Sequence, residues 1–273
     1  MTMVQDAVLG VVQGLSEFLP ISSTAHLRIV PAFLGWEDPG AAFTAVVQLG
    51  TVLAVLLYFR VELIAIARAW LGSVIGHRRP RTLDERLGWY LVLGTVPIAV
   101  VGLLFRHTIE NGARSLVLIG STLIALGLLL LAAERVGRRD RKMGDLTLRD
   151  ALWIGVAQAA ALVPGVSRSG ATITGGLFLG LDRTAAARFS FLLSVPAVVL
   201  SGLFELVSIV GDGTGGSSAG GLVIATVTAF IVGYASIGLL LRFLGSHSTG
   251  VFVAYRVVLG VVVLALVAGG AIS

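Results

Sequence analysis

Apolar residues fill six stretches of this chain that are long enough to cross a lipid bilayer as helices. A helical crossing needs about 20 consecutive, mostly apolar residues. The pattern therefore predicts an all-α polytopic membrane protein, with residues 1–273 forming a single integral membrane domain. The six predicted full transmembrane helices are residues 41–59, 87–105, 115–134, 186–210, 219–241 and 251–270.

Other apolar stretches are too short to cross. The first runs for only about 15 residues before Pro20, or about 22 Å of helix, and another stops at Pro164. Irregular backbone at membrane depth is tolerated only where protein buries it or where it lines a wet cavity. We interpret the short stretches as two re-entrant helical hairpins, formed by residues 5–19 with 23–34 and by residues 151–163 with 169–181.

The two hairpins are copies of one sequence. GVVQGLSEFLPISSTAH (10–26) aligns with GVAQAAALVPGVSRSG (155–170) at an offset of 145, which matches Gln13 with Gln158 and Ser22 with Ser167. Each half of the chain, approximately 5–134 and 150–270, then holds one hairpin and three spans. Because three is odd, the second half is inverted, and the hairpin tips meet near the midplane. This inverted-topology repeat directs half-helix N-termini, which favour anions, toward a central site.

The charges orient this arrangement. The chain has 20 Lys and Arg against 15 Asp and Glu, a formal net charge of +5. Arginines concentrate in residues 60–86 and in the connecting loop 135–149, two spans apart, so the positive-inside rule makes both loops cytoplasmic. Segments 35–40 and 211–218 lack Lys and Arg and are expected outside, as is loop 106–114 despite its two arginines. Basic cytoplasmic loops account for the net charge, so we expect no nucleic-acid partner.

Composition narrows the chemistry further. Hydrophobic residues make up 56% of the chain and charged residues only 13%, where a soluble domain has about 25%. The chain has no cysteine, which excludes disulfides and thiol catalysis. The glycine-rich stretch 211–221 is better interpreted as a loop than as a phosphate loop, because no Gly-Lys-Ser/Thr follows it.

Candidate chemistry in the first hairpin begins at Gln13 and Glu17, four residues apart on one helical face. A carboxylate at membrane depth is costly and indicates function, either as a metal ligand or as a group that orients His26. After Pro20 come Ser22, Ser23 and Thr24. One of these hydroxyls is expected to cap the next helix. Ser23 lies one turn before His26, which pairs a candidate nucleophile with a proton acceptor.

The second hairpin carries a candidate phosphate cradle. Arg168 offers a planar fork of donors suited to phosphoryl oxygens. Glycine permits close approach of the backbone to a ligand, and hydroxyls flank the arginine. We assign to phosphate binding Ser22, Ser167, Arg168, Ser169, Gly170 and Thr172. Arg256 lies within a predicted span, where either a buried structural partner or an anchor at the cytoplasmic end explains it.

These motifs resemble those of the bacterial undecaprenyl-diphosphatase family of the bacitracin-resistance type. The resemblance rests on Gln13-x-x-x-Glu17 leading into the Pro20–His26 stretch, together with Pro164–Thr172. It implies hydrolysis of undecaprenyl diphosphate to undecaprenyl phosphate and inorganic phosphate, which recycles the carrier lipid for peptidoglycan synthesis. It further implies a multi-pass protein of the bacterial plasma membrane whose active site opens to the extracytoplasmic side.

With that resemblance, the expected catalytic residues are Ser23, His26, Glu17 and Arg168. Ser23 attacks the terminal phosphorus or positions a water that does, and His26 exchanges protons. A divalent cation, Mg²⁺ or Ca²⁺, suits a diphosphate, with Glu17 and Gln13 as ligands. The rival function is a transporter or flippase for an anion or a polyprenyl phosphate, since inverted repeats with broken helices are typical of transporters. The sequence leaves open whether the chain forms a homodimer.

Overall fold

The computed structural model describes residues 1–105, 115–212 and 218–272, without the side chains of residues 41 and 201–212. The predicted external loop 106–114 and the centre of the glycine-rich stretch, 213–217, lie outside the described residues. The described part is built from α-helices and two short 3₁₀ turns, with only an isolated bridge between Arg141 and Leu181 besides. The prediction of an all-α protein is therefore confirmed.

Each predicted span corresponds to a helix. Five helices are long and apolar enough to cross a membrane individually, and the sixth, α3, passes only together with α4, from which a 74° bend separates it. This confirms a multi-pass membrane protein. The six helices are α3 (Gly40–Tyr58), α5 (Leu83–Leu104), α7 (Leu116–Val136), α10 (Arg183–Asp212), α11 (Ala219–Leu244) and α12 (Gly250–Ala268).

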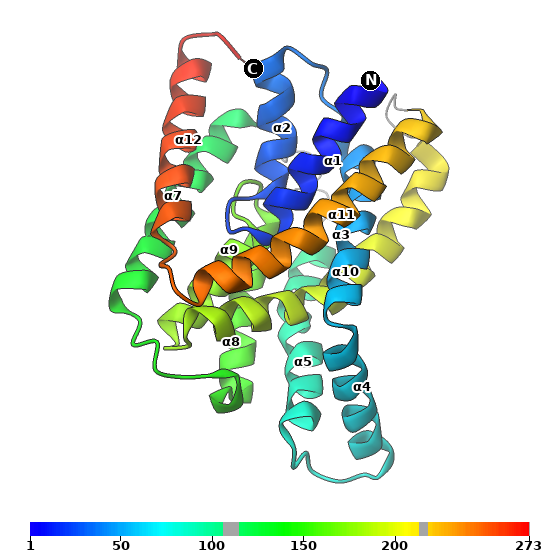
Figure 1. The fold of residues 1–273 in the computed structure, drawn as a ribbon, viewed down its shortest axis with the longest axis vertical. Coiled ribbons are helices and arrows are strands. Elements are labelled where there is room, and N and C mark those ends of the chain that lie inside the picture. Colours follow the sequence, from blue (N-terminus) through cyan, green and yellow to red (C-terminus); the bar gives the residue numbers. More distant parts are fainter. Residues whose placement is uncertain (106–114, 213–217, 273) are drawn as a thin grey trace.

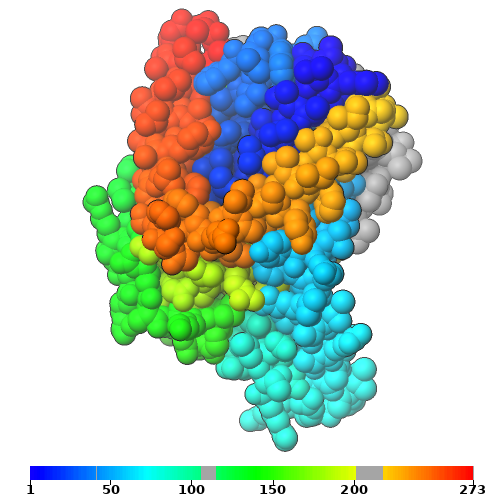
Figure 2. All heavy atoms as spheres, viewed as in Figure 1, coloured from blue at the N-terminus to red at the C-terminus, as the bar shows by residue number. Residues whose placement is uncertain are grey.

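The prediction of a cytoplasmic loop over residues 60–86 was wrong in its first half, which forms helix α4 (Arg60–Ile75). Its arginines mark a charged segment, but Ala, Leu and Arg are also strong helix formers. The helix packs on α5, where Trp70 meets Trp89 edge to face at 5.7 Å between ring centroids. Figures 1 and 2 show α4 and the start of α5 (cyan) projecting from the rest of the molecule.

Both predicted hairpins are present as pairs of short helices. The first is α1 (Met3–Phe18) with α2 (Ser23–Leu34); the second is α8 (Leu148–Ala159) with the 3₁₀ turn η2 (Ala160–Leu162) and α9 (Arg168–Phe178). Figure 1 shows both chain termini at one end of the molecule and the connection between α4 and α5 at the other. The first hairpin enters from the end with the termini and the second from the opposite end, as an inverted repeat requires.

The two halves of the chain pack crosswise. Gly10 of α1 lies so close to α11 that a Cβ there would come within 2.4 Å of the Ala225 carbonyl oxygen. The repeat mate, Gly155 of α8, lies equally close to α5, where a Cβ would come within 2.2 Å of the Gly94 carbonyl oxygen. Each hairpin is thus held by a span of the other half.

Candidate active site

The two hairpin turns have the same backbone geometry. Ser22 and Ser167 adopt positive φ angles of 77° and 72°, which costs a non-glycine residue about 1–3 kcal/mol. Each caps the helix that follows: Ser22 Oγ accepts from the Ala25 amide at 3.4 Å and Ser167 Oγ from the Gly170 amide at 3.0 Å. The expected capping in the first hairpin is confirmed, and the second hairpin repeats it.

Arg256 of α12 joins the two turns. Its Nη1 donates to the Pro20 carbonyl at 3.0 Å, and its Nη2 donates to the carbonyls of Gly165 and Val166 at 3.0 and 3.1 Å. Its Nε donates to the Leu123 carbonyl of α7 at 3.2 Å. The side chain is fully buried. Of the two alternatives for Arg256, the structure supports the buried structural partner, because four main-chain carbonyls bind its guanidinium.

Glu17 lies where the hairpins meet and contacts both. Its Oε1 forms an ion pair with Arg168 Nη2 of α9. Its Oε2 accepts from Ser23 Oγ at 2.6 Å and from Gln13 Nε2 at 3.0 Å. The side chains of Glu17 and Arg168 are 7% and 18% exposed. Four predicted site residues, separated by up to 155 positions in the chain, therefore form one hydrogen-bonded cluster.

His26 is hydrogen-bonded to groups other than Ser23, although the two residues are one helical turn apart. Its Nδ1 lies 2.7 Å from the Ser22 carbonyl oxygen and its Nε2 lies 2.6 Å from the Tyr255 hydroxyl. The group that contacts Ser23 Oγ is Glu17. In place of the expected Ser23–His26 pair, the structure shows two hydrogen-bonded pairs, Ser23 with Glu17 and His26 with Tyr255.

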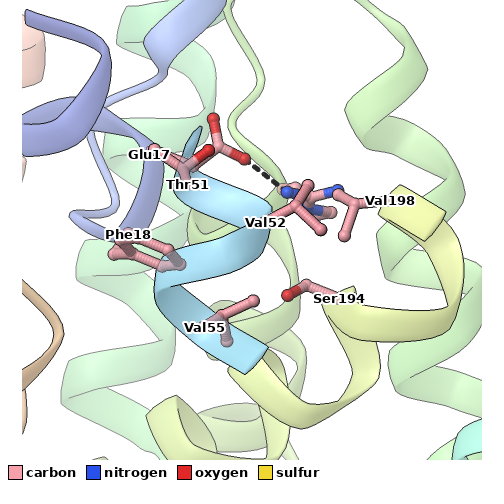
Figure 3. Close-up of a pocket in the computed structure, with 8 residues that line it drawn as sticks. Glu17, Phe18, Thr51, Val52, Val55, Ser194 and Val198 are labelled. Carbon is pink, nitrogen blue, oxygen red and sulfur yellow. Dashed lines mark hydrogen bonds and ion pairs between the residues drawn. The ribbon is translucent and has the colours of Figure 1, made fainter. Parts of the chain in front are cut away.

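A narrow crevice lies beside the Glu17–Arg168 ion pair and is closed too tightly in this conformation to hold a water molecule. Figure 3 shows Glu17 and Thr51 at one end and Phe18, Val55 and Ser194 nearer the other, with the ion pair drawn as a dashed line from Glu17. Its lining combines this ion pair and two residues with hydroxyl groups with four apolar side chains. The lining residues are Glu17, Phe18, Thr51, Val52, Val55, Arg168, Ser194 and Val198.

The other residues of the predicted phosphate cradle hold the hairpins in place. Ser169 Oγ donates to the Leu19 carbonyl at 3.0 Å, which links α9 to the first turn. Thr172 is fully buried, donates to the Arg168 carbonyl at 2.8 Å and pairs with Ser190 of α10 at 2.6 Å. A Cβ at Gly170 would come within 3.0 Å of Arg256 Nη1. Their contribution to phosphate binding stays a prediction, since these contacts already explain why the residues are there.

Sequence reasoning missed Thr51 and Ser194, whose hydroxyls line the crevice. Each donates to a carbonyl of its own helix three residues earlier, at 2.8 Å to Gln48 and at 2.7 Å to Phe191. Isolated hydroxyls in apolar spans commonly bond their own backbone in this way. No local pattern therefore distinguishes these two from a purely structural Ser or Thr.

The divalent cation expected at Glu17 and Gln13 stays a prediction. Within the described ranges, no cluster of three or more His, Cys, Asp or Glu side chains is placed to hold a metal. Gln13 Oε1, however, is buried and has no hydrogen-bond partner in the described part of the chain. One carboxylate and one amide oxygen match the way Mg²⁺ is held when substrate phosphates complete its shell.

The chain matches a known protein family over most of its length. The family described as bacitracin resistance protein BacA matches residues 6–262. The chain belongs to the BacA family. It is 52% identical to the undecaprenyl-diphosphatase of Nocardioides sp. over 270 residues, with 98% of each chain covered. The undecaprenyl-diphosphatase of Myxococcus xanthus is 50% identical over 273 residues, which cover 100% of this BacA chain and 92% of the relative. That of Chlorobaculum tepidum is 48% identical, with 99% of each covered.

Proposed function

We propose that this BacA-family protein hydrolyses undecaprenyl diphosphate to undecaprenyl phosphate and inorganic phosphate. The observation that carries the proposal is Glu17, which contacts Ser23 of one hairpin and Arg168 of the other beside a crevice with apolar walls. A carboxylate, a hydroxyl and a guanidinium are the groups that phosphoryl transfer to a nucleophile needs. Relatives at about 50% identity over the whole chain carry the name of this activity.

Arg168 binds the diphosphate in this mechanism. Its hydrogen bond to Glu17 uses Nη2, so the rest of the fork is directed to phosphoryl oxygens. A guanidinium in a nearly buried site stabilises negative charge that develops on the terminal phosphoryl group. The apolar walls formed by Val52, Val55 and Val198 hold the first isoprene units of the lipid.

Ser23 is the nucleophile and Glu17 its base. Ser23 Oγ attacks the terminal phosphorus as its proton moves to Glu17 Oε2, the bond to the bridging oxygen breaks, and undecaprenyl phosphate leaves. Water then attacks the phosphoserine, which releases inorganic phosphate and restores the Ser23 hydroxyl. His26 exchanges protons with the leaving phosphate.

Gln13 Oε1 and Glu17 would hold a divalent cation, Mg²⁺ or Ca²⁺. Bound there, the cation supplies positive charge to the diphosphate oxygens. The residues of this chain keep their own tasks: Arg168 orients the phosphoryl group and Glu17 accepts the Ser23 proton.

The protein acts in the bacterial plasma membrane with its site open to the outer face, and it returns the carrier lipid to peptidoglycan synthesis. Arginine-rich residues 76–82, between α4 and α5, and 137–147, between α7 and α8, are then cytoplasmic. The rival transporter function explains the inverted hairpins, but it gives no role to a Ser23 hydroxyl hydrogen-bonded to Glu17.

The test is phosphate release from undecaprenyl diphosphate by purified protein in detergent, where there is no membrane to cross. We expect turnover by the wild type and a loss of at least about 100-fold in kcat for Glu17→Gln. Glu62→Gln is the matched control, because Glu62 of α4 pairs with Arg188 of α10 at 2.8 Å and neither residue lines the crevice. Absence of turnover by the wild type, or near-normal turnover by Glu17→Gln, contradicts the proposal. A Ser23→Ala variant that keeps most of its rate favours direct attack by water.

A further inference from the structure

The hydrogen bonds of His26 define its tautomer. The Ser22 carbonyl oxygen only accepts hydrogen bonds, so His26 Nδ1, 2.7 Å away, carries the proton. In the neutral ring Nε2 is then an acceptor, and the Tyr255 hydroxyl, at 2.6 Å, donates to it. The two rings lie nearly parallel, with centroids 5.6 Å apart and planes inclined by 9°. Both ends of the imidazole are therefore held.

Tyr255 connects this ring to the helix that organises both hairpin turns. The next residue on α12 is Arg256, whose Nη1 binds the Pro20 carbonyl. Helix α12 thus binds the first hairpin at two points. Arg256 binds the loop between α1 and α2, and Tyr255 binds His26 in the first turn of α2. His26 is 7% exposed, whereas Tyr255 is 43% exposed. The phenol therefore lies between the buried imidazole and the surroundings of the protein.

We propose that Tyr255 is a positioning residue for the proton exchange of His26. Its hydroxyl keeps the imidazole as the Nδ1–H tautomer and holds the ring in one orientation, so His26 gains or loses a proton at Nε2 when the Tyr255 hydroxyl turns away from it. The inference rests on the proposed function, which assigns proton exchange to His26. It adds a residue that the hairpin motifs do not contain, and it gives His26 a partner other than Ser23.

Steady-state kinetics test the proposal with Tyr255→Phe, which keeps the ring and removes the hydroxyl. We expect kcat for undecaprenyl diphosphate to fall about tenfold with KM unchanged, because a proton-transfer contribution is weakened while substrate contacts stay. Tyr234→Phe is the matched control: Tyr234 is 40% exposed and packs against Tyr58 at 5.3 Å between centroids. The double variant His26→Ala/Tyr255→Phe should be no slower than His26→Ala alone.

The ¹⁵N chemical shifts of histidine-labelled protein give a readout that does not depend on turnover. The chain has four histidines, and His26→Asn identifies the signals of His26. We expect a single Nδ1–H tautomer in the wild type and in Tyr234→Phe, and a mixture of tautomers in Tyr255→Phe.

The proposal is overturned if Tyr255→Phe keeps its full kcat, or if the two substitutions add in the double variant. A single unchanged tautomer in Tyr255→Phe also overturns it. A wild type that shows the tautomer signature but releases no phosphate contradicts the proposed function instead, so the two failures are distinguishable.

Discussion

Arg168 and Arg256 show how far individual residues can be interpreted from sequence. Arg168 is flanked by hydroxyls and glycine, and this local pattern predicted a polar site. In the structure Arg168 forms an ion pair with Glu17. Arg256 has only apolar neighbours and one tyrosine nearby in the chain. Its partners are main-chain carbonyls, one of them 236 residues away. A backbone carbonyl leaves no mark on the sequence, so the role of Arg256 becomes visible only in the folded chain.

His26 illustrates a second limit. Helical spacing placed Ser23 and His26 on neighbouring positions of α2, and this spacing is present in the structure. Spacing does not decide where a side chain points, however. Glu17 reaches Ser23 from α1, and Tyr255 reaches His26 from α12. Neither packing arrangement is encoded in the local motif.

Replacing each arginine by lysine separates the two roles. Arg168→Lys keeps the charge but loses the planar fork, so we expect kcat/KM to fall by about 100-fold with an unchanged thermal midpoint in detergent. Arg256→Lys cannot reach four carbonyls, and each buried carbonyl left unpaired costs about 1–3 kcal/mol. We therefore expect a clearly lower thermal midpoint. The interpretation is wrong if Arg168→Lys unfolds early or if Arg256→Lys melts like the wild type.

Among the helices, those with a strong breaker or a long apolar run were predicted well. Pro20 and Pro164 correctly separate the half-helices of the two hairpins, because proline removes a backbone donor, although Pro31, Pro97 and Pro196 lie inside helices. Helix α4 was not predicted, because its arginines interrupt the apolar run and are more typical of a cytoplasmic loop. Its contact with α5, where a Cβ at Gly88 would come within 2.4 Å of Trp70 Cβ, depends on tertiary packing.

Close helix contacts at glycine support a test of how the second hairpin is held. Gly155→Ala places a methyl group against the Gly94 backbone of α5, which cannot move like a flexible side chain. We expect the thermal midpoint to drop, with a cost of about 1–3 kcal/mol, and phosphate release to fall as the second hairpin shifts. In Gly72→Ala on α4 nothing lies within 4 Å of the new Cβ, so that control should melt at or above the wild-type midpoint. Equal midpoints for the two variants would contradict the close packing.

At the scale of the whole molecule, partly buried ion pairs tie the segment that connects the repeats to both halves. Glu134 at the end of α7 pairs with Arg139 of the connecting segment and with Arg183 of α10, and it accepts from the Thr249 hydroxyl at 2.7 Å. Arg141 binds Asp150 of α8 at 2.6 Å, and this hydrogen bond raises the pKa of Arg141 above its usual value. The sequence marked this segment only as basic, since a count of charges does not show which carboxylates they meet.

The orientation of the molecule gives the last prediction. The chain has no cysteine, so one introduced thiol reports one side of the membrane. Glu37, between α2 and α3, and Arg79, between α4 and α5, are both exposed in the structure and lie on opposite sides if the basic segments are cytoplasmic. In spheroplasts, a membrane-impermeant maleimide should label Glu37→Cys and leave Arg79→Cys unlabelled until the membrane is permeabilised, after which both react. The reverse labelling pattern, in variants that still release phosphate, would place the segment between α2 and α3 in the cytoplasm. It would then exclude a site open to the outer face.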